Sequence, residues 1–257
     1  MNQRSRIVVS FVVLFVLYQS AEGVGARLLH SFPIQAGLMT ACVLAAWPLS
    51  HWLGFRGYGA WALGRARRGW SWLAGGLLLA IAAKAAAAWL GLRSGILVPS
   101  PAGSAMPSPV LLAALPMMLL STFVPSLAED ILTRGFWYRA AGIAWRRGAA
   151  FVGFSATMYV LNHVYRIGNG PLEWLSLASM GIACATALWR TGSLWAAVGL
   201  HWGWNLANGL VDALVPMDIA LPAHAPLLSI AANLALTVVV LALGRGRDLP
   251  EPRAPNA

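Results

Sequence analysis

Long apolar runs dominate this chain and constrain its fold more than any other feature. A helix needs roughly 20 apolar residues to cross the hydrocarbon core of a bilayer. Eight candidate runs lie at Ile7–Ala21, Phe32–Leu53, Gly69–Leu92, Val110–Ala140, Ala149–Tyr165, Leu172–Leu188, Leu194–Asp212 and Leu227–Leu243. Only 10% of the 257 residues are charged, against roughly 25% in an ordinary soluble domain. The sequence therefore predicts an all-α, polytopic membrane helix bundle of about eight transmembrane helices, and it excludes a disordered chain.

The positive charges are distributed as a membrane topology requires. With the N-terminus in the cytoplasm, the inner segments carry fourteen arginines and the outer segments carry three, which are Arg27, Arg93 and Arg166. This difference follows the positive-inside rule and predicts that both termini are cytoplasmic. Topology then explains the net charge of +10. Because the basic residues are scattered between apolar runs, no nucleic-acid partner is expected. The Ala-, Arg- and Trp-rich composition favours a bacterial inner membrane as the location.

The chain is expected to form one integral-membrane domain over residues 1–257. Its motif-bearing catalytic core is expected at 110–210 and a flexible cytoplasmic tail at 245–257. The first run follows the basic segment Met1–Arg6, so a cleaved signal peptide is the alternative interpretation of that span. The segment Arg93–Pro109 is rich in proline, serine and glycine and is expected to lie outside without regular structure.

Ionisable residues inside apolar runs are candidates for function, because charges are costly in a bilayer. Asp130 and Arg134 are four residues apart and can form an ion pair, whereas Glu129 points about 100° away from Asp130 around the helix. The alternative for this group is a structural ion pair at a helix end. The fourth run is extended to Ala140 because only then does Glu129 lie deep enough to meet His163 of the next run.

Two later runs carry polar residues on single helical faces. In the fifth run these recur every four residues, at Ser155, Tyr159 and His163. In the seventh run they fall within about 40° of one another, at His201, Asn205, Asn208 and Asp212. A polar stripe on an apolar span must face a cavity, water or another polar helix.

Together these residues can hydrolyse a peptide bond. Glu129 would take a proton from a water molecule that His163 shares or orients. His201 and Asn205 would donate hydrogen bonds to the developing oxyanion. In the alternative route, Glu129, His163 and His201 would hold one divalent metal such as zinc. The glutamate route is favoured because the set offers no strong metal ligand beyond these three.

Three short motifs resemble those of the CPBP intramembrane proteases, a family that includes the CAAX prenyl endopeptidases and bacteriocin-processing relatives. Glu129–Gly135 is similar to the EExxxR motif of that family, Tyr159–His163 to its FxxxH motif, and His201–Asn205 to its HxxxN motif. The lead-in Thr191–Trp195 also resembles the approach to the last motif. The resemblance covers about Val110–Leu210.

The resemblance implies an eight-helix bundle with four catalytic residues, Glu129, His163, His201 and Asn205. It further implies a structural role for Arg134. Two positions depart from the family pattern. Asp130 stands in place of the second Glu and is expected to support Arg134, and Tyr159 stands in place of Phe. Neither change removes a proposed catalytic group.

The predicted function is therefore that of an intramembrane endopeptidase acting on a membrane-associated peptide or protein. A non-catalytic immunity or scaffold protein of the same fold is the first alternative. A transporter that uses the polar stripe is the second, disfavoured because the sequence has no clear internal repeat. Lys84, in the third run, is expected to snorkel or to pair with Asp212 or Glu129.

Overall fold

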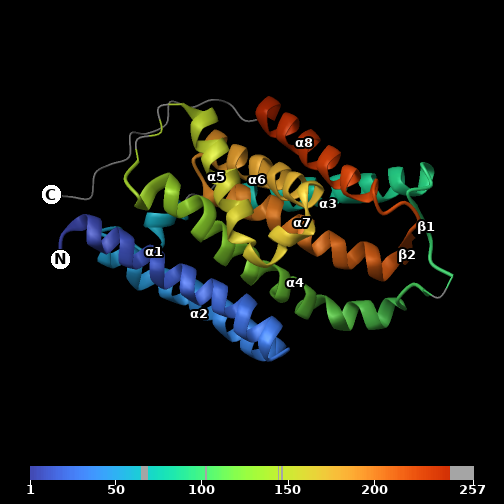
Figure 1. Ribbon diagram of the computed structural model, residues 1–257, viewed down its shortest axis with the longest axis horizontal. Coiled ribbons are helices and arrows are strands. Elements are labelled where there is room, and N and C mark those ends of the chain that lie inside the picture. Colours follow the sequence, from blue (N-terminus) through green and yellow to red (C-terminus); the bar gives the residue numbers. More distant parts are fainter. Residues whose placement is uncertain (65–68, 102, 144, 146, 244–257) are drawn as a thin grey trace.

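The computed structural model describes residues 1–64, 69–101, 103–143, 145 and 147–243. Within these residues the chain forms eight α-helices (Figure 1). They are α1 (Gln3–Ser20), α2 (Phe32–Trp52), α3 (Gly69–Arg93), α4 (Ser108–Asp130), α5 (Gly148–Asn162), α6 (Pro171–Thr191), α7 (Leu194–Leu214) and α8 (Ala225–Leu243). The predicted all-α bundle is confirmed. The tail expected at 245–257 lies outside the described residues.

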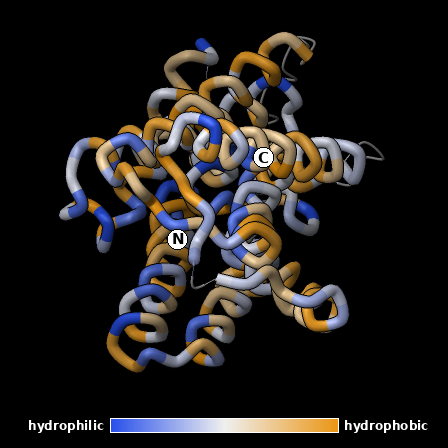
Figure 2. The backbone as a smooth tube through the Cα atoms, turned by 90° about the vertical axis from the view of Figure 1, so that its right-hand side faces the viewer, coloured by the Kyte–Doolittle hydropathy of each residue, from blue (hydrophilic) through white to orange (hydrophobic). Residues whose placement is uncertain are grey.

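Six helical segments in the described part of the chain are long and apolar enough to cross a membrane. They are Gln3–Leu28, Phe32–Trp52, Gly69–Arg93, Ser108–Ala140, Pro171–Thr191 and Ala225–Leu243. Hydrophobic residues predominate along the helices, as Figure 2 shows. The α5 helix has only 15 residues, and the polar stripe lowers the mean hydropathy of α7. The protein is thus an integral, multi-pass membrane protein, whereas eight spans and cytoplasmic termini stay predictions.

The fourth span continues to Ala140, as the sequence predicts, but it changes its helical form on the way. The α4 helix passes directly into a π-helix, η3 (Ile131–Ala140). A second π-helix, η1 (Ala21–Leu28), extends α1. Stretches of π-helix occur frequently at functional sites. In η3 the backbone at Gly135 approaches the chain closely, because a Cβ there would lie 2.7 Å from the carbonyl oxygen of Trp61.

The fifth helix ends three residues earlier than predicted, at Asn162 instead of Tyr165. His163 is its C-cap, with φ −85° and ψ 49°, and the 3₁₀ turn η4 (Val164–Asn169) follows. In an α-helix the N–H of His163 would bond to the carbonyl oxygen of Tyr159. Here His163 Nδ1 bonds to that carbonyl oxygen instead, at 2.8 Å. The backbone N–H of His163 donates to the carbonyl oxygen of Val160. The side chain therefore replaces the backbone bond that would have continued the helix.

The expectation that Arg93–Pro109 lacks regular structure is wrong in part. Strand β1 (Leu97–Pro99) pairs antiparallel with strand β2 (Met217–Ile219), and Leu97 faces Ile219 in the register. This two-stranded ribbon joins the segments that follow α3 and α7. It lies at the opposite end of the bundle from the N-terminus (Figure 1).

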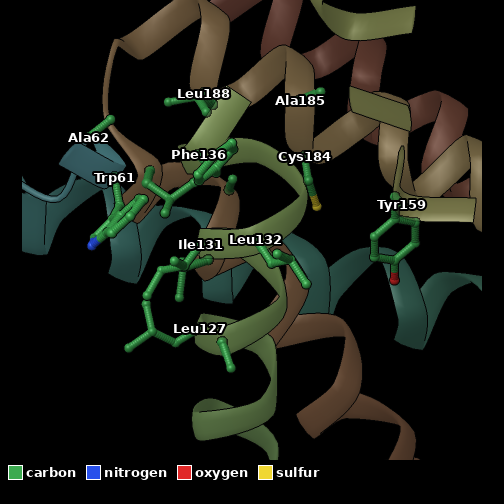
Figure 3. Close-up of a cluster of buried hydrophobic side chains, with 14 of the residues drawn as sticks. Trp61, Ala62, Leu127, Ile131, Leu132, Phe136, Tyr159, Cys184, Ala185 and Leu188 are labelled. Atoms are coloured by element: carbon green, nitrogen blue, oxygen red, sulfur yellow. The ribbon is translucent and has the colours of Figure 1, made fainter. Parts of the chain in front are cut away.

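Close backbone packing joins α3 to α7 and fixes the position of the polar stripe. A Cβ at Gly203 would lie 2.5 Å from the carbonyl oxygen of Leu77, and one at Gly76 would lie 2.8 Å from the amide nitrogen of Leu200. Small residues permit such approaches between helices in lipid. On the other side of the site, apolar side chains of η3 fill the space between Trp61 and Tyr159 (Figure 3).

Candidate active site

Glu129, near the C-terminal end of α4, is the centre of the polar cluster, although its side chain is only 6% exposed. Its Oε1 accepts a hydrogen bond from Asn162 Nδ2 at 3.0 Å and lies 3.4 Å from His163 Nδ1. Its Oε2 lies 3.7 Å from His201 Nε2. The structure thus brings together the carboxylate and both imidazoles that the sequence places on three separate spans.

The ring of His163 has a defined proton arrangement. A carbonyl oxygen only accepts hydrogen bonds, so the 2.8 Å contact with the Tyr159 carbonyl assigns a proton to His163 Nδ1. In the neutral ring, Nε2 then carries the free lone pair. His163 is 14% exposed, more than Glu129 or His201. It is therefore the most accessible of the three groups.

His201 is held from behind by Asp130. Its Nδ1 donates to Asp130 Oδ1 at 3.2 Å, which leaves Nε2 directed at Glu129. The same Oδ1 forms the predicted ion pair with Arg134 Nη1, and both of these side chains are 0% exposed. The ion pair is confirmed, but the sequence analysis missed its contact with His201. Because the helix continues through η3, the pair does not lie at a helix end.

Aromatic contacts hold the charged groups in place. The ring of Tyr159 packs edge-on against His163, with centroids 4.6 Å apart, and against His201 at 5.7 Å. The guanidinium of Arg134 lies 4.4 Å from the centroid of the same ring, and its Nη1 donates to Thr133 Oγ1 at 3.2 Å. Tyr159 thus connects both histidines to the buried cation.

Asn205 lies one helical turn from His201 and faces α4. Its Nδ2 donates to Ser126 Oγ at 3.1 Å, and Ser126 is three residues before Glu129. Asn205, Asn208 and Asp212 also line a cavity of about 530 Å³, which we call the chamber. Of the three environments that the sequence left open for the polar stripe, these three residues face a cavity.

Two polar residues at the site were missed from the sequence. Asn162 donates to Glu129, and its own side-chain and backbone oxygens accept hydrogen bonds from Gln19 Nε2 at 2.9 and 2.8 Å. Gln19 follows the apolar run of α1 and stands between Tyr18 and Ser20, and this polar end of the run was the signal that could have pointed to it. Buried Tyr18, its neighbour, also faces Glu129. The first helix thus orients the central carboxylate.

The arrangement gives little support to a metal centre. Among the described residues, no group of three or more His, Cys, Asp or Glu side chains is placed to hold a metal ion. Glu129, His163 and His201 would be the ligands of such an ion. However, the His163 nitrogen nearest to Glu129 is Nδ1, which already bonds to the Tyr159 carbonyl oxygen, so coordination through Nδ1 would break that hydrogen bond. In this arrangement the three side chains do not share the geometry of a metal site.

Comparison with known proteins gives a family match in the middle of the chain. Residues 111–207 match the family model described as Rce1-like, type II CAAX prenyl endopeptidase Rce1-like. No curated protein and no solved structure matches the chain. The matched segment begins in α4 and ends in α7, so it contains Glu129, His163, His201 and Asn205 and leaves α1 to α3 and α8 outside. Residues 111–207 of this chain are thus similar to the Rce1-like family of CAAX prenyl endopeptidases.

Proposed function

We propose that this protein is an intramembrane endopeptidase of a bacterial inner membrane, which hydrolyses a peptide bond of a membrane-associated peptide or protein with water activated by Glu129. The observation that carries the proposal is the buried Glu129 carboxylate, held by Asn162 and approached by two imidazoles. A carboxylate, a proton-sharing ring and nearby amide donors are the groups that amide hydrolysis requires.

In the proposed mechanism, the attacking water lies between the Glu129 carboxylate and the lone pair of His163 Nε2. Glu129 accepts one proton from this water as its oxygen bonds to the carbonyl carbon of the substrate. The carbonyl becomes an oxyanion, which accepts hydrogen bonds from Asn205 Nδ2 and His201 Nε2. Glu129 then returns the proton to the amide nitrogen and the C–N bond breaks. One water is consumed, and one carboxyl and one amino terminus are formed.

This mechanism places a specific demand on His201. Its Nδ1 already donates to Asp130, so donation from Nε2 to the oxyanion requires a ring that carries both protons. Asp130 and Glu129 lie on opposite sides of the ring, 3.2 and 3.7 Å from its two nitrogens. Their negative charges balance the imidazolium before the attack, and once Glu129 has taken the proton, Asp130 and the oxyanion balance it. Asp130 is therefore a positioning residue for His201 as well as the counter-ion of Arg134.

The test compares the wild-type protein, purified in detergent, with Glu129→Gln and His201→Ala. Each protein is incubated with membrane proteins extracted from bacteria, and new peptide termini are identified by mass spectrometry. The matched control is Glu22→Gln, which makes the same chemical change at a glutamate that accepts a hydrogen bond from Gln35. New termini are expected with the wild type and the control and are absent with both site variants.

Two further readings sharpen this experiment. Elemental analysis of the purified wild type is expected to show no stoichiometric metal, and one bound zinc per chain lost in Glu129→Gln would overturn the water-activation scheme. If the wild type and Glu129→Gln give identical termini while both are folded, the peptidase proposal fails. A non-catalytic immunity or scaffold protein then becomes the better explanation of the fold.

A further inference from the structure

Asn162 lies closer to the Glu129 carboxylate than either imidazole does. Its Nδ2 donates to Glu129 Oε1 at 3.0 Å, whereas the nearest nitrogens of His163 and His201 lie 3.4 and 3.7 Å from the carboxylate oxygens. A side-chain amide can present either its NH₂ group or its oxygen. Because an ionised carboxylate only accepts hydrogen bonds, the reversed amide would place two acceptors against each other. The orientation of the Asn162 amide therefore decides whether this residue holds Glu129 or repels it.

The packing around Asn162 does not select that orientation. Its side chain borders a groove of about 230 Å³ between α1, η3 and α5. The other described residues that line this groove are apolar except Thr133, whose hydroxyl already donates to the carbonyl oxygen of Glu129. The two ends of an amide have nearly the same size, so apolar walls accept either orientation equally. Hydrogen bonds must make the choice.

Gln19 of α1 supplies these hydrogen bonds. Its Nε2 donates to the backbone oxygen of Asn162 at 2.8 Å and to Asn162 Oδ1 at 2.9 Å. Since α5 ends at Asn162, this backbone oxygen lacks a partner from a following helical turn. A carbonyl oxygen only accepts, so it fixes the NH₂ group of Gln19 toward Asn162, and the second hydrogen of that group meets Oδ1. Asn162 Nδ2 is thereby left to face Glu129.

The other end of the Gln19 amide shows that the donor end is the one the site uses. Gln19 Oε1 is buried without a hydrogen-bond partner, and a buried acceptor without a partner is costly. An apolar side chain of the same size would avoid that cost but could not bond to Asn162. The α1 helix also lies outside the segment that matches the family model. The three motifs therefore contain no trace of this contact.

We propose that Gln19 is a positioning residue, which holds the amide of Asn162 with its NH₂ group toward Glu129 and so holds the carboxylate for its attack on water. This inference rests on the proposed function, because Glu129 is the base in that mechanism. Gln19 touches neither water nor substrate and acts only through Asn162. The first span is then a part of the active enzyme and not a signal peptide that is removed.

The test uses full-length variants and a synthetic peptide that spans one cleavage site found with the wild type. The carboxylate introduced by Gln19→Glu only accepts, so it should turn the Asn162 amide around and lower kcat about 10- to 100-fold. Gln19→Met offers no hydrogen bond and should lower kcat about 2- to 10-fold. Gln19→Lys only donates and should retain more activity than Gln19→Met. The matched control is Gln3→Glu, because Gln3 lies on the same helix and also donates to a backbone oxygen, that of Leu53.

Double variants separate positioning from packing. Because Gln19 acts through Asn162, Gln19→Glu should lower kcat little further in an Asn162→Ala background, and KM should change less than kcat. Full activity of folded Gln19→Glu overturns the inference, as does a loss that adds fully to that of Asn162→Ala. The intact mass of the active wild type is expected to include α1, and an active chain that has lost α1 also overturns the inference.

A spectroscopic measurement tests the amide without any need for activity. In protein labelled with ¹⁵N-asparagine, the Nδ2 signal of Asn162 is identified by its loss in Asn162→Ala. Glu129→Gln should shift this signal in an otherwise wild-type chain but leave it nearly unchanged in a Gln19→Glu background, where the NH₂ group faces residue 19. Shifts of this kind without any cleavage leave the role of Gln19 intact and remove the peptidase. Cleavage by a wild type whose Asn162 signal responds to Glu129→Gln equally in both backgrounds leaves the peptidase intact and removes the role of Gln19.

Discussion

Replacing Asp130 by Asn tests how the buried charges are balanced. The change preserves the size of the side chain but removes the only carboxylate that the described residues pair with Arg134, and neither side chain has any exposed surface. Arg134 Nε and Nη2 already lack hydrogen-bond partners, and among the described residues no second carboxylate lies within ion-pair distance of Arg134. Removing one partner of a buried pair costs about 3–5 kcal/mol, and we expect a loss of unfolding free energy of that size.

The measurement is equilibrium unfolding in mixed detergent micelles, combined with the double variant Asp130→Asn/Arg134→Met. Removing both charges leaves no unpaired ion, so the double variant is expected to recover most of the lost stability, with a coupling energy above about 2 kcal/mol. Asp130→Glu keeps the charge and serves as the control. Peptidase activity is expected to stay low in the single and the double variant, because both lack the carboxylate that balances a doubly protonated His201.

Two results would refute this reasoning. A single variant Asp130→Asn within about 1 kcal/mol of the wild type would show that Asp130 does not compensate the charge of Arg134. Equal stability losses in the single and double variants would show that the two side chains are not coupled. Full activity in a stable double variant would remove Asp130 from the positioning of His201.

Three further changes extend the test to packing and to the hydrogen bonds around the site. Gly203→Ala places a methyl group against the α3 backbone and should lower unfolding free energy by about 1–3 kcal/mol; Gly75→Ala, with open space around it, should not. Asn162→Ala removes a hydrogen bond to a carboxylate, so kcat should fall about 10- to 100-fold, whereas Thr157→Ala on the same helix should leave kcat unchanged. Tyr159→Phe keeps both ring contacts with the histidines and should retain activity. Tyr159→Leu loses aromatic pairs of about 0.5–1.5 kcal/mol each, so its unfolding temperature and its kcat should both fall.

The meeting of Glu129, His163 and His201 could be predicted because membrane spans have a limited geometry. Apolar runs define the helices, their rise gives the depth of each polar residue, and burial of charge in lipid is costly enough to single out functional positions. The extension of the fourth span to Ala140 followed from this argument and is confirmed. Depth and helical face together thus approximate a three-dimensional site.

Other parts of the site depend on contacts that no periodicity contains. The His163 ring bonds to the backbone oxygen of Tyr159 and so ends α5. This competition between a side chain and the helical backbone bond cannot be read from the hydropathy pattern. The ribbon pairs two three-residue strands from distant segments, too short to show alternation. Gln19 reaches Asn162 from a helix 143 residues earlier. Each of these features needs the tertiary arrangement before it can be seen.

The division of the chamber walls has a consequence for how such proteins diversify. Glu129, His163 and His201 lie within the segment that matches the family model, whereas Lys84 and Asn233 come from α3 and α8, which lie outside it. Mutations in these two helices can change the lining of the chamber without touching Glu129, His163 or His201. Proteins that share all three motifs can therefore differ in the shape and charge of this chamber.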